Sequence, residues 1–370
     1  MIEADSAGRR HYPMRRFVLA LTIAALVFVR VPLRADDLQF GPFGDYLESL
    51  RAQLGIPGLA AVIVGDSSVL WERGFGQLDV ERNIAARTDT PFHLDALTQM
   101  ITATLVLSCV EEGRLSLEDQ IGKYRPDSPD SKLTIRQILT HTSGLPDYQV
   151  YAYRPDRYDS LTFAISACRA ASFRSAVAGL LDRLAMVDSA PGPDVTRLVP
   201  PDENIAGSTI ERYTRVLDRL AVPYAVDKKG HPSPSKYAAT TLTGAGGLIA
   251  SARDLAQFDL GLRKGVLLRA DTITAAWQPP LGHDGQPLPH GMGWFGQTYN
   301  GERIAWQFGV GDNASSSLTI TVPPRLLAGR TVRTLILLAN SDGLVRGVPL
   351  TAGDVTASLF GKLFLGTFIR

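Results

Sequence analysis

The sequence has little charge imbalance and few residues that commonly bind metals. Its 38 basic and 37 acidic residues leave a formal net charge of +1 without a basic stripe, so we expect no nucleic-acid partner. The 6 histidines lie far apart, and none has the spacing to cysteine or glutamate that zinc sites use. The sequence therefore predicts no metal and no cofactor.

Cysteine is also scarce, with only Cys109 and Cys168 in the chain. An exported protein could pair them, but a disulfide requires nearby Cα atoms, which a sequence does not reveal. Cys109 lies in a strongly apolar segment, where a thiol packs like a small hydrophobic side chain. We expect a buried free thiol rather than a disulfide.

The apolar run near the N-terminus, Phe17–Val29, is shorter than the roughly 20 residues that span a bilayer. Four arginines precede it and Ala35 follows it, an order typical of a secretory signal. We predict a signal peptide over residues 1–35 and one exported domain over residues 36–370, periplasmic or secreted. A membrane is expected as a partner only if the signal segment is retained as an anchor.

Hydrophobic patterns predict strands at both ends of the chain. The apolar run 59–65 and the segment 68–72 after it are typical of a hairpin. Near the other end, residues 316–322 alternate between apolar and polar, and residues 334–339 form a continuous apolar run. Both patterns favour strands, which indicates one sheet built from the two chain ends.

Helices are expected between these strands. Residues 45–54 have an amphipathic pattern, and residues 96–112 are apolar nearly all round, with Gly113 at the position of a glycine cap. We predict an α+β fold in which an antiparallel sheet is flanked by helices. A helical lobe is inserted at about residues 95–265.

Several short segments along the chain form a recognisable series. They are Ile56–Leu59 (IPGL), Arg73–Gly76 (RGFG), Thr88–Phe92, Glu111–Asp119, Ile135–Pro146, Gly244–Leu255 and Gly291–Trp294 (GMGW). No single segment is specific, but in this order they resemble the superfamily of class C β-lactamases, penicillin-binding proteins and esterases over about residues 45–345. The resemblance implies a β-lactamase-like serine hydrolase fold.

The first motif of that superfamily, a nucleophilic serine followed one helical turn later by a lysine, is altered here. Where the family has Phe-x-x-x-Ser-x-Thr-Lys, the chain has Ala96 at the serine position and Gln99 at the lysine position. Alanine has no lone pair with which to attack, and a glutamine amide is not a base near neutral pH. The resemblance therefore implies a degenerate active site.

The other two motifs are altered as well. Alignment places the family's tyrosine at Tyr153 and the third residue of that motif at Pro155. In the segment that matches His-x-Gly, Gln307 replaces the histidine and Gly309 is kept. Tyr153 could relay a proton, but its reference pKa is about 10 and no lysine remains to lower it.

Backbone groups survive such side-chain changes. The resemblance places the oxyanion donors at the N–H groups of Ala96 and Val310, beside a helix N-terminus. We expect these amides and Tyr153 to bind a small ligand that contains an acyl or peptide group, without reacting with it.

Other polar residues have alternative interpretations. His93 and Asp95 flank the old nucleophile position and could perform acid–base chemistry, but Asp95 is expected to cap the helix. His141 lies in a segment whose role in the family is structural. Ser233–Lys236 matches the spacing of Ser-x-x-Lys, but the prolines within and before it oppose a helix. Ser315–Ser317 are expected to begin a strand.

We therefore predict a pseudoenzyme, that is, an exported, non-catalytic binding or scaffold protein. The alternative is an esterase-like or peptidase-like hydrolase that uses non-standard residues around Tyr153.

Overall fold

The computed structural model describes residues 1, 37–145, 148–197, 205–323 and 332–369. The expected signal segment lies outside these residues. Among the described helices, none combines the length and the apolar character that crossing a membrane requires.

A seven-stranded antiparallel sheet forms the centre of the described chain. The strand nearest the N-terminus pairs with the strand nearest the C-terminus, with Leu59 opposite Ala339 and Val64 opposite Thr334. This pairing confirms that both chain ends build one sheet. In order across the sheet the strands are β10 (Phe295–Tyr299), β11 (Glu302–Gly311), β12 (Ser315–Val322), β13 (Arg333–Ala339), β1 (Gly58–Val64), β2 (Val69–Asp79) and β3 (Ile84–Ala85).

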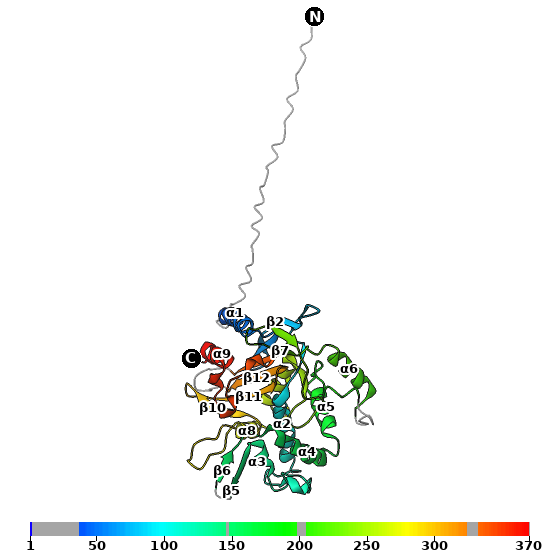
Figure 1. The fold of residues 1–370 in the computed structure, drawn as a ribbon, viewed down its shortest axis with the longest axis vertical. Helices are drawn as coiled ribbons and strands as arrows, with labels where there is room; N and C mark the ends of the chain where they lie inside the picture. The colour runs from blue at the N-terminus through cyan, green and yellow to red at the C-terminus, as the bar shows by residue number, and fades with distance from the viewer. Residues whose placement is uncertain (2–36, 146–147, 198–204, 324–331, 370) are drawn as a thin grey trace.

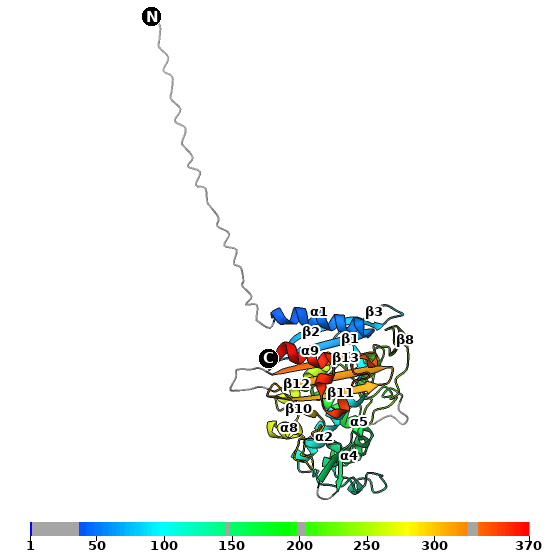
Figure 2. The ribbon, with the colours of Figure 1, turned by 60° about the vertical axis from the view of Figure 1, so that its left-hand side comes forward.

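Both faces of the sheet are covered, which explains why β1 is apolar and buried along its whole length. Alternate β1 residues face opposite sides. Ala60 and Val62 belong to the core shared with α2 (Thr98–Glu111) and α7 (Ala252–Arg263), whereas Leu59 and Ala61 belong to the core shared with α1 (Asp37–Gln53) and α9 (Leu359–Phe368). Figure 2 shows α1 and α9, from opposite ends of the chain, close to each other beside the sheet.

The inserted helical region lies to one side of the sheet, drawn mainly in green in Figure 1. The predicted α+β fold is thereby confirmed. Three two-stranded sheets accompany the described helices: β4 (Pro91–His93) with β9 (Ile249–Ser251), β5 (Thr142–Leu145) with β6 (Tyr148–Tyr151), and β7 (Tyr224–Val226) with β8 (Pro232–Pro234). The remaining helices are α3 (Ile135–Leu139), α4 (Leu161–Arg169), α5 (Phe173–Arg183), α6 (Gly207–Leu217) and α8 (Ala270–Ala276).

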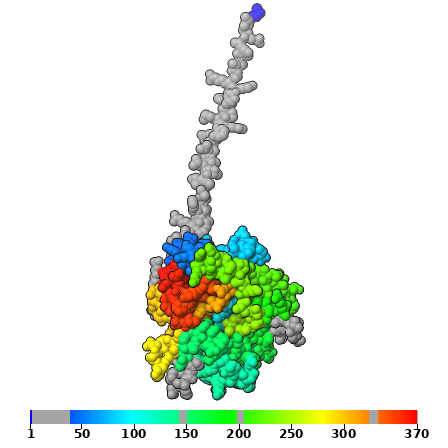
Figure 3. Space-filling view, in the orientation of Figure 1, coloured from blue at the N-terminus to red at the C-terminus, as the bar shows by residue number. Residues whose placement is uncertain are grey.

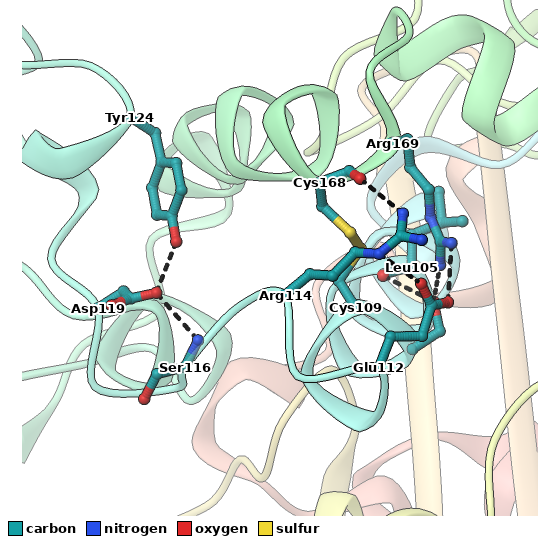
Figure 4. Close-up of a disulfide and its surroundings, with 10 residues drawn as sticks. Leu105, Cys109, Glu112, Arg114, Ser116, Asp119, Tyr124, Cys168 and Arg169 are labelled. Atoms are coloured by element: carbon teal, nitrogen blue, oxygen red, sulfur yellow. Dashed lines mark hydrogen bonds and ion pairs between the residues drawn. A yellow bond between two sulfur atoms is a disulfide. The ribbon is translucent and has the colours of Figure 1, made fainter.

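The two cysteines form a disulfide, so the expectation of a free thiol at Cys109 was wrong. Packing of α4 against α2 brings the Cα atoms of Cys109 and Cys168 to 6.3 Å, within disulfide range (Figure 4). Arg114 Nη1 donates to the Cys168 carbonyl at 3.0 Å and holds the same two helix ends together.

Candidate functional site

The predicted site lies where β11 meets the turn before α2. Residues 95–97 form a single 3-10 turn, η1, from which α2 continues. A Cβ added at Gly309 would lie 2.1 Å from the Leu94 carbonyl oxygen and 2.9 Å from the Leu97 nitrogen. A residue with a side chain would therefore force the two backbones apart. Gly309 allows β11 to approach η1 closely.

The predicted amide donors lie at the surface of this junction. In the described chain, β10 pairs with β11 only as far as Trp306, and the Phe308 N–H donates to Gln307 Oε1 at 2.9 Å. Because N–H groups two residues apart in a strand point the same way, the Val310 N–H faces the same outer edge. Val310 is 38% exposed and Ala96 is half-buried. In Figure 3 the orange part of the chain reaches the surface between the red and green segments.

Gln99 is buried against a neutral histidine. The His141 Nε2–H donates to Gln99 Oε1 at 3.0 Å, while His141 Nδ1 accepts the Arg154 backbone N–H at 3.2 Å. This pattern fits one neutral tautomer, with the proton on Nε2. Burial, and less so the nearby His290, lowers the pKa of His141 well below its ordinary value. The Gln99 side chain, which sequence analysis aligned with the family's lysine, is therefore an amide held by an uncharged ring.

Gln307 has a second buried histidine as its partner. Its Nε2 donates to His290 Nε2 and to the Gly293 carbonyl, each at 3.2 Å. His290 Nδ1 donates in turn to the Gly291 carbonyl at 2.7 Å, and burial lowers the pKa of His290 to about 3. The rings of His141 and His290 are 4.5 Å apart. Two glutamines and two neutral histidines thus form a buried network, which we call the Gln–His network.

Tyr153 packs against this network but offers no accessible base. Its ring centroid lies 4.6 Å from that of His141 and 5.9 Å from that of Phe308. Its hydroxyl is buried and makes no hydrogen bond in the described chain. Burial raises the pKa of Tyr153 above its ordinary value, and the nearby Gln99 side chain lowers it by less. Water at neutral pH therefore meets neither a phenolate nor an exposed hydroxyl.

Pro155 and Tyr158 have structural positions. Pro155 begins a 3-10 helix, η3 (Pro155–Ser160), where a missing N–H costs nothing. The Tyr158 hydroxyl is buried and donates to the Leu139 carbonyl at 2.7 Å. Neither residue brings a reactive group to Ala96.

Asp95 does not cap α2, so that prediction was wrong. Its φ is 50°, and its carboxylate turns away from the helix to accept the Ser315 Oγ–H at 2.6 Å. The other carboxylate oxygen lies 3.0 Å from His93 Nδ1. The His93 ring is buried, stacks on Tyr237, and donates from Nε2 to the Ala239 carbonyl at 3.2 Å. Because the carboxylate lies between serine and histidine, this histidine cannot take the serine proton.

The other serines singled out in the sequence lie in strands. Ser233 belongs to the exposed strand β8, so it does not share a helical face with Lys236. Ser316 Oγ donates to the Ser341 carbonyl at 2.6 Å, and Ser317 Oγ donates to the Leu94 carbonyl at 3.0 Å.

His290 is the residue of the site that the sequence reasoning missed. It directly precedes the family-like segment Gly291–Trp294, which is the signal that could have identified it. Its role depends on Gln307, 17 residues later in the chain, which the structure places beside it.

Comparison with known proteins identifies the family of this chain. A sequence model of the Beta-lactamase family matches residues 43–348. The chain belongs to the β-lactamase family. Over 97 residues it is 32% identical to Protein flp of Staphylococcus aureus (strain N315), which covers 25% of this chain and 20% of that protein. Over 112 residues it is 24% identical to Serine beta-lactamase-like protein LACTB, mitochondrial, of Bos taurus, covering 28% and 20%. The matches span about a fifth of these relatives.

Solved structures with low sequence identity to this chain share its fold. The octameric penicillin-binding protein homologue from Pyrococcus abyssi superimposes with a TM-score of 0.67 at 19% identity, over 88% of this chain and 77% of that one. FmtA from Staphylococcus aureus gives 0.66 at 14% identity, over 90% of each chain.

Proposed function

We propose that this chain is a non-catalytic member of the β-lactamase family that binds the carbonyl group of an acyl- or peptide-containing ligand. The observation that carries the proposal is at the start of α2. Ala96 occupies the nucleophile position, and Gln99 is bound to His141 where the family has a lysine. A covalent acyl step needs a nucleophile and a base within hydrogen-bond reach of each other, and this pair supplies neither.

The alternative, a hydrolase that uses residues around Tyr153, has less support. Direct hydrolysis requires a base that contacts the attacking water. The Tyr153 hydroxyl is buried, and burial raises its pKa, which keeps it protonated at neutral pH. His141 and His290 are buried as well, and their ring nitrogens are already engaged by neighbours.

The surviving donors favour an uncharged carbonyl over a carboxylate. Backbone N–H groups at Ala96 and Val310, with the positive end of α2 behind them, suit a carbonyl oxygen. Gln99 and Gln307 are uncharged, and the Asp95 carboxylate lies beside η1, where it would repel an anion. We therefore expect amides or esters to bind better than the corresponding acids.

Titration with N-acetyl-alanyl-alanine amide, followed by NMR or calorimetry, tests this binding mode. Val310→Pro removes the proposed N–H donor on an edge that β12 does not use, whereas Val310→Ala keeps it and serves as the control. We expect the proline variant to bind roughly 10-fold more weakly and the alanine variant to bind like the original protein. Equal binding by the two variants would refute the proposed donor.

Turnover of p-nitrophenyl acetate separates the two hypotheses. We expect hydrolysis at the uncatalysed rate with the original protein and with Tyr153→Phe. Hydrolysis that is abolished by Tyr153→Phe would support the hydrolase and contradict the pseudoenzyme.

We also propose that the protein is exported, as a domain over residues 36–370. The Cys109–Cys168 disulfide supports export, because disulfides persist in oxidising compartments such as the periplasm. Intact-mass measurement of the mature protein should give an N-terminus near Asp36. A soluble cytoplasmic protein that retains its first residues would contradict this proposal.

A further inference from the structure

A cavity of about 490 Å³ opens at the end of α2 opposite to Ala96. Its walls come from the last turns of α2, from α5, and from residues 265–269 between α7 and α8. Since α2 has 14 residues, its two ends are about 20 Å apart. The cavity is therefore separate from the candidate site described above.

The floor of the cavity is apolar. Leu105, Leu180 and Leu267 line it, and each is buried. Gly179 of α5 also lines it, and a Cβ added there would have no atom within 4 Å. The volume lies in the range of roughly 300–1,000 Å³ that is usual for small-molecule sites with apolar walls and a few polar groups.

Acidic groups on the wall already have partners. Arg169 donates to Glu112 Oε1 at 2.8 Å and to Ser108 Oγ at 2.5 Å, and Figure 4 shows Arg169 and Glu112 next to the disulfide. Glu111 Oε1 accepts the Arg269 backbone N–H at 2.8 Å. Because three arginines and two glutamates line the cavity, its formal charge is +1.

Arg183 supplies the positive charge without an acidic partner. Its Nη2 donates to the Val266 carbonyl at 2.5 Å, which holds the guanidinium against the wall formed by residues 265–269. In the part of the chain that the structure describes, Arg183 forms no ion pair. A guanidinium carries five N–H donors in a planar fork that fits a carboxylate, so most of its donors remain for a ligand.

We propose that this cavity binds a small amphipathic monocarboxylate. The carboxylate pairs with Arg183, and the hydrocarbon body lies on the leucine floor next to Gly179. This site does not depend on the function proposed for the Ala96–Val310 junction, since it shares no lining residue with that junction.

Calorimetric titration with decanoate, compared with decanol, tests the proposal. Gly179→Phe fills the cavity from an exposed helix position, where phenylalanine is tolerated at least as well as glycine. Gly366→Phe is the matched control, because Gly366 is another exposed helical glycine with no neighbour within 4 Å of an added Cβ, and it lies in α9. Arg183→Gln removes the charge while keeping a hydrogen-bonding side chain.

We expect the original protein and Gly366→Phe to bind decanoate equally, and at least about 10-fold more tightly than decanol. Gly179→Phe should lose binding of both compounds. Arg183→Gln should lose about 10-fold for decanoate and leave decanol unchanged. Decanoate binding that survives Gly179→Phe, or equal affinities for decanoate and decanol in the original protein, would overturn the proposal.

Discussion

The two ends of α2 differ in the polar side chains that surround them. At its N-terminal end, Gln99 accepts a hydrogen bond from His141 and Gln307 donates one to His290 within a buried, uncharged network. In the described chain, Gln99 Nε2 has no hydrogen-bond partner. At its C-terminal end, arginines and glutamates surround a disulfide and an open cavity. The comparison teaches that the buried polar side chains of the Gln–His network are uncharged, whereas the charged side chains at the other end of α2 line an open cavity.

Removal of the disulfide should have the largest effect on stability, and it tests the C-terminal end of α2. The cysteines are 59 positions apart, and the loop-entropy model gives a loss of about 4 kcal/mol in the free energy of unfolding for a loop of this length. Urea unfolding of the double variant Cys109→Ala and Cys168→Ala measures it. A loss below about 1 kcal/mol would mean that the ion pairs around Arg169 hold the two helices without the disulfide.

Gly309→Ala tests the close approach of β11 to η1 at the other end. Because the new Cβ would lie 2.1 Å from the Leu94 carbonyl oxygen, we expect a loss of roughly 1–3 kcal/mol. Gly179→Ala is the control, since its Cβ meets no atom and a helical glycine-to-alanine change stabilises by up to about 1 kcal/mol. Equal stabilities of the two variants in urea would contradict the close approach.

The Gln–His network makes stability depend on pH. Burial lowers the pKa of His290 to about 3 and that of His141 well below 6.5, so the unfolded chain binds more protons than the folded one at acidic pH. The free energy of unfolding should therefore be unaffected by these groups above pH 6.5. Below pH 6.5 it should fall by about 1.4 kcal/mol per pH unit for each histidine.

Urea unfolding between pH 7 and pH 5 measures this slope. The double variant His141→Gln and His290→Gln should have a flatter pH dependence than the original protein. An unchanged slope in the double variant would mean that other groups control the acid sensitivity.

The fold could be predicted largely from the sequence, because buried strands and helices leave apolar patterns that do not depend on distant partners. The disulfide could not, since the distance between Cys109 and Cys168 follows from how α4 packs on α2. The misplaced cap at Asp95 has the same cause, because Ser315, 220 residues later in the chain, binds the carboxylate instead. The assignment of Ala96 to the nucleophile position rests on alignment alone and stays a prediction, whereas the buried partners of Gln99 and Gln307 could be known only from the structure.

Restoring the first motif should give the smallest effect. Ala96→Ser alone should show no measurable turnover of a chromogenic cephalosporin, because base assistance is typically worth about 10²–10⁴-fold and the Gln99 amide is not a base. Adding Gln99→Lys should give weak activity, since a lysine at this buried position must replace the hydrogen bond to His141. Rates typical of a working esterase from Ala96→Ser alone would reveal a surviving base.

The most direct test of the non-catalytic assignment is intact-mass analysis of the unmodified protein after incubation with a fluorescent penicillin. With Ala96 at the nucleophile position, we expect no increase in mass and no fluorescent band after denaturing electrophoresis. A stoichiometric adduct that peptide mapping places on a serine near η1 or β11 would contradict the account.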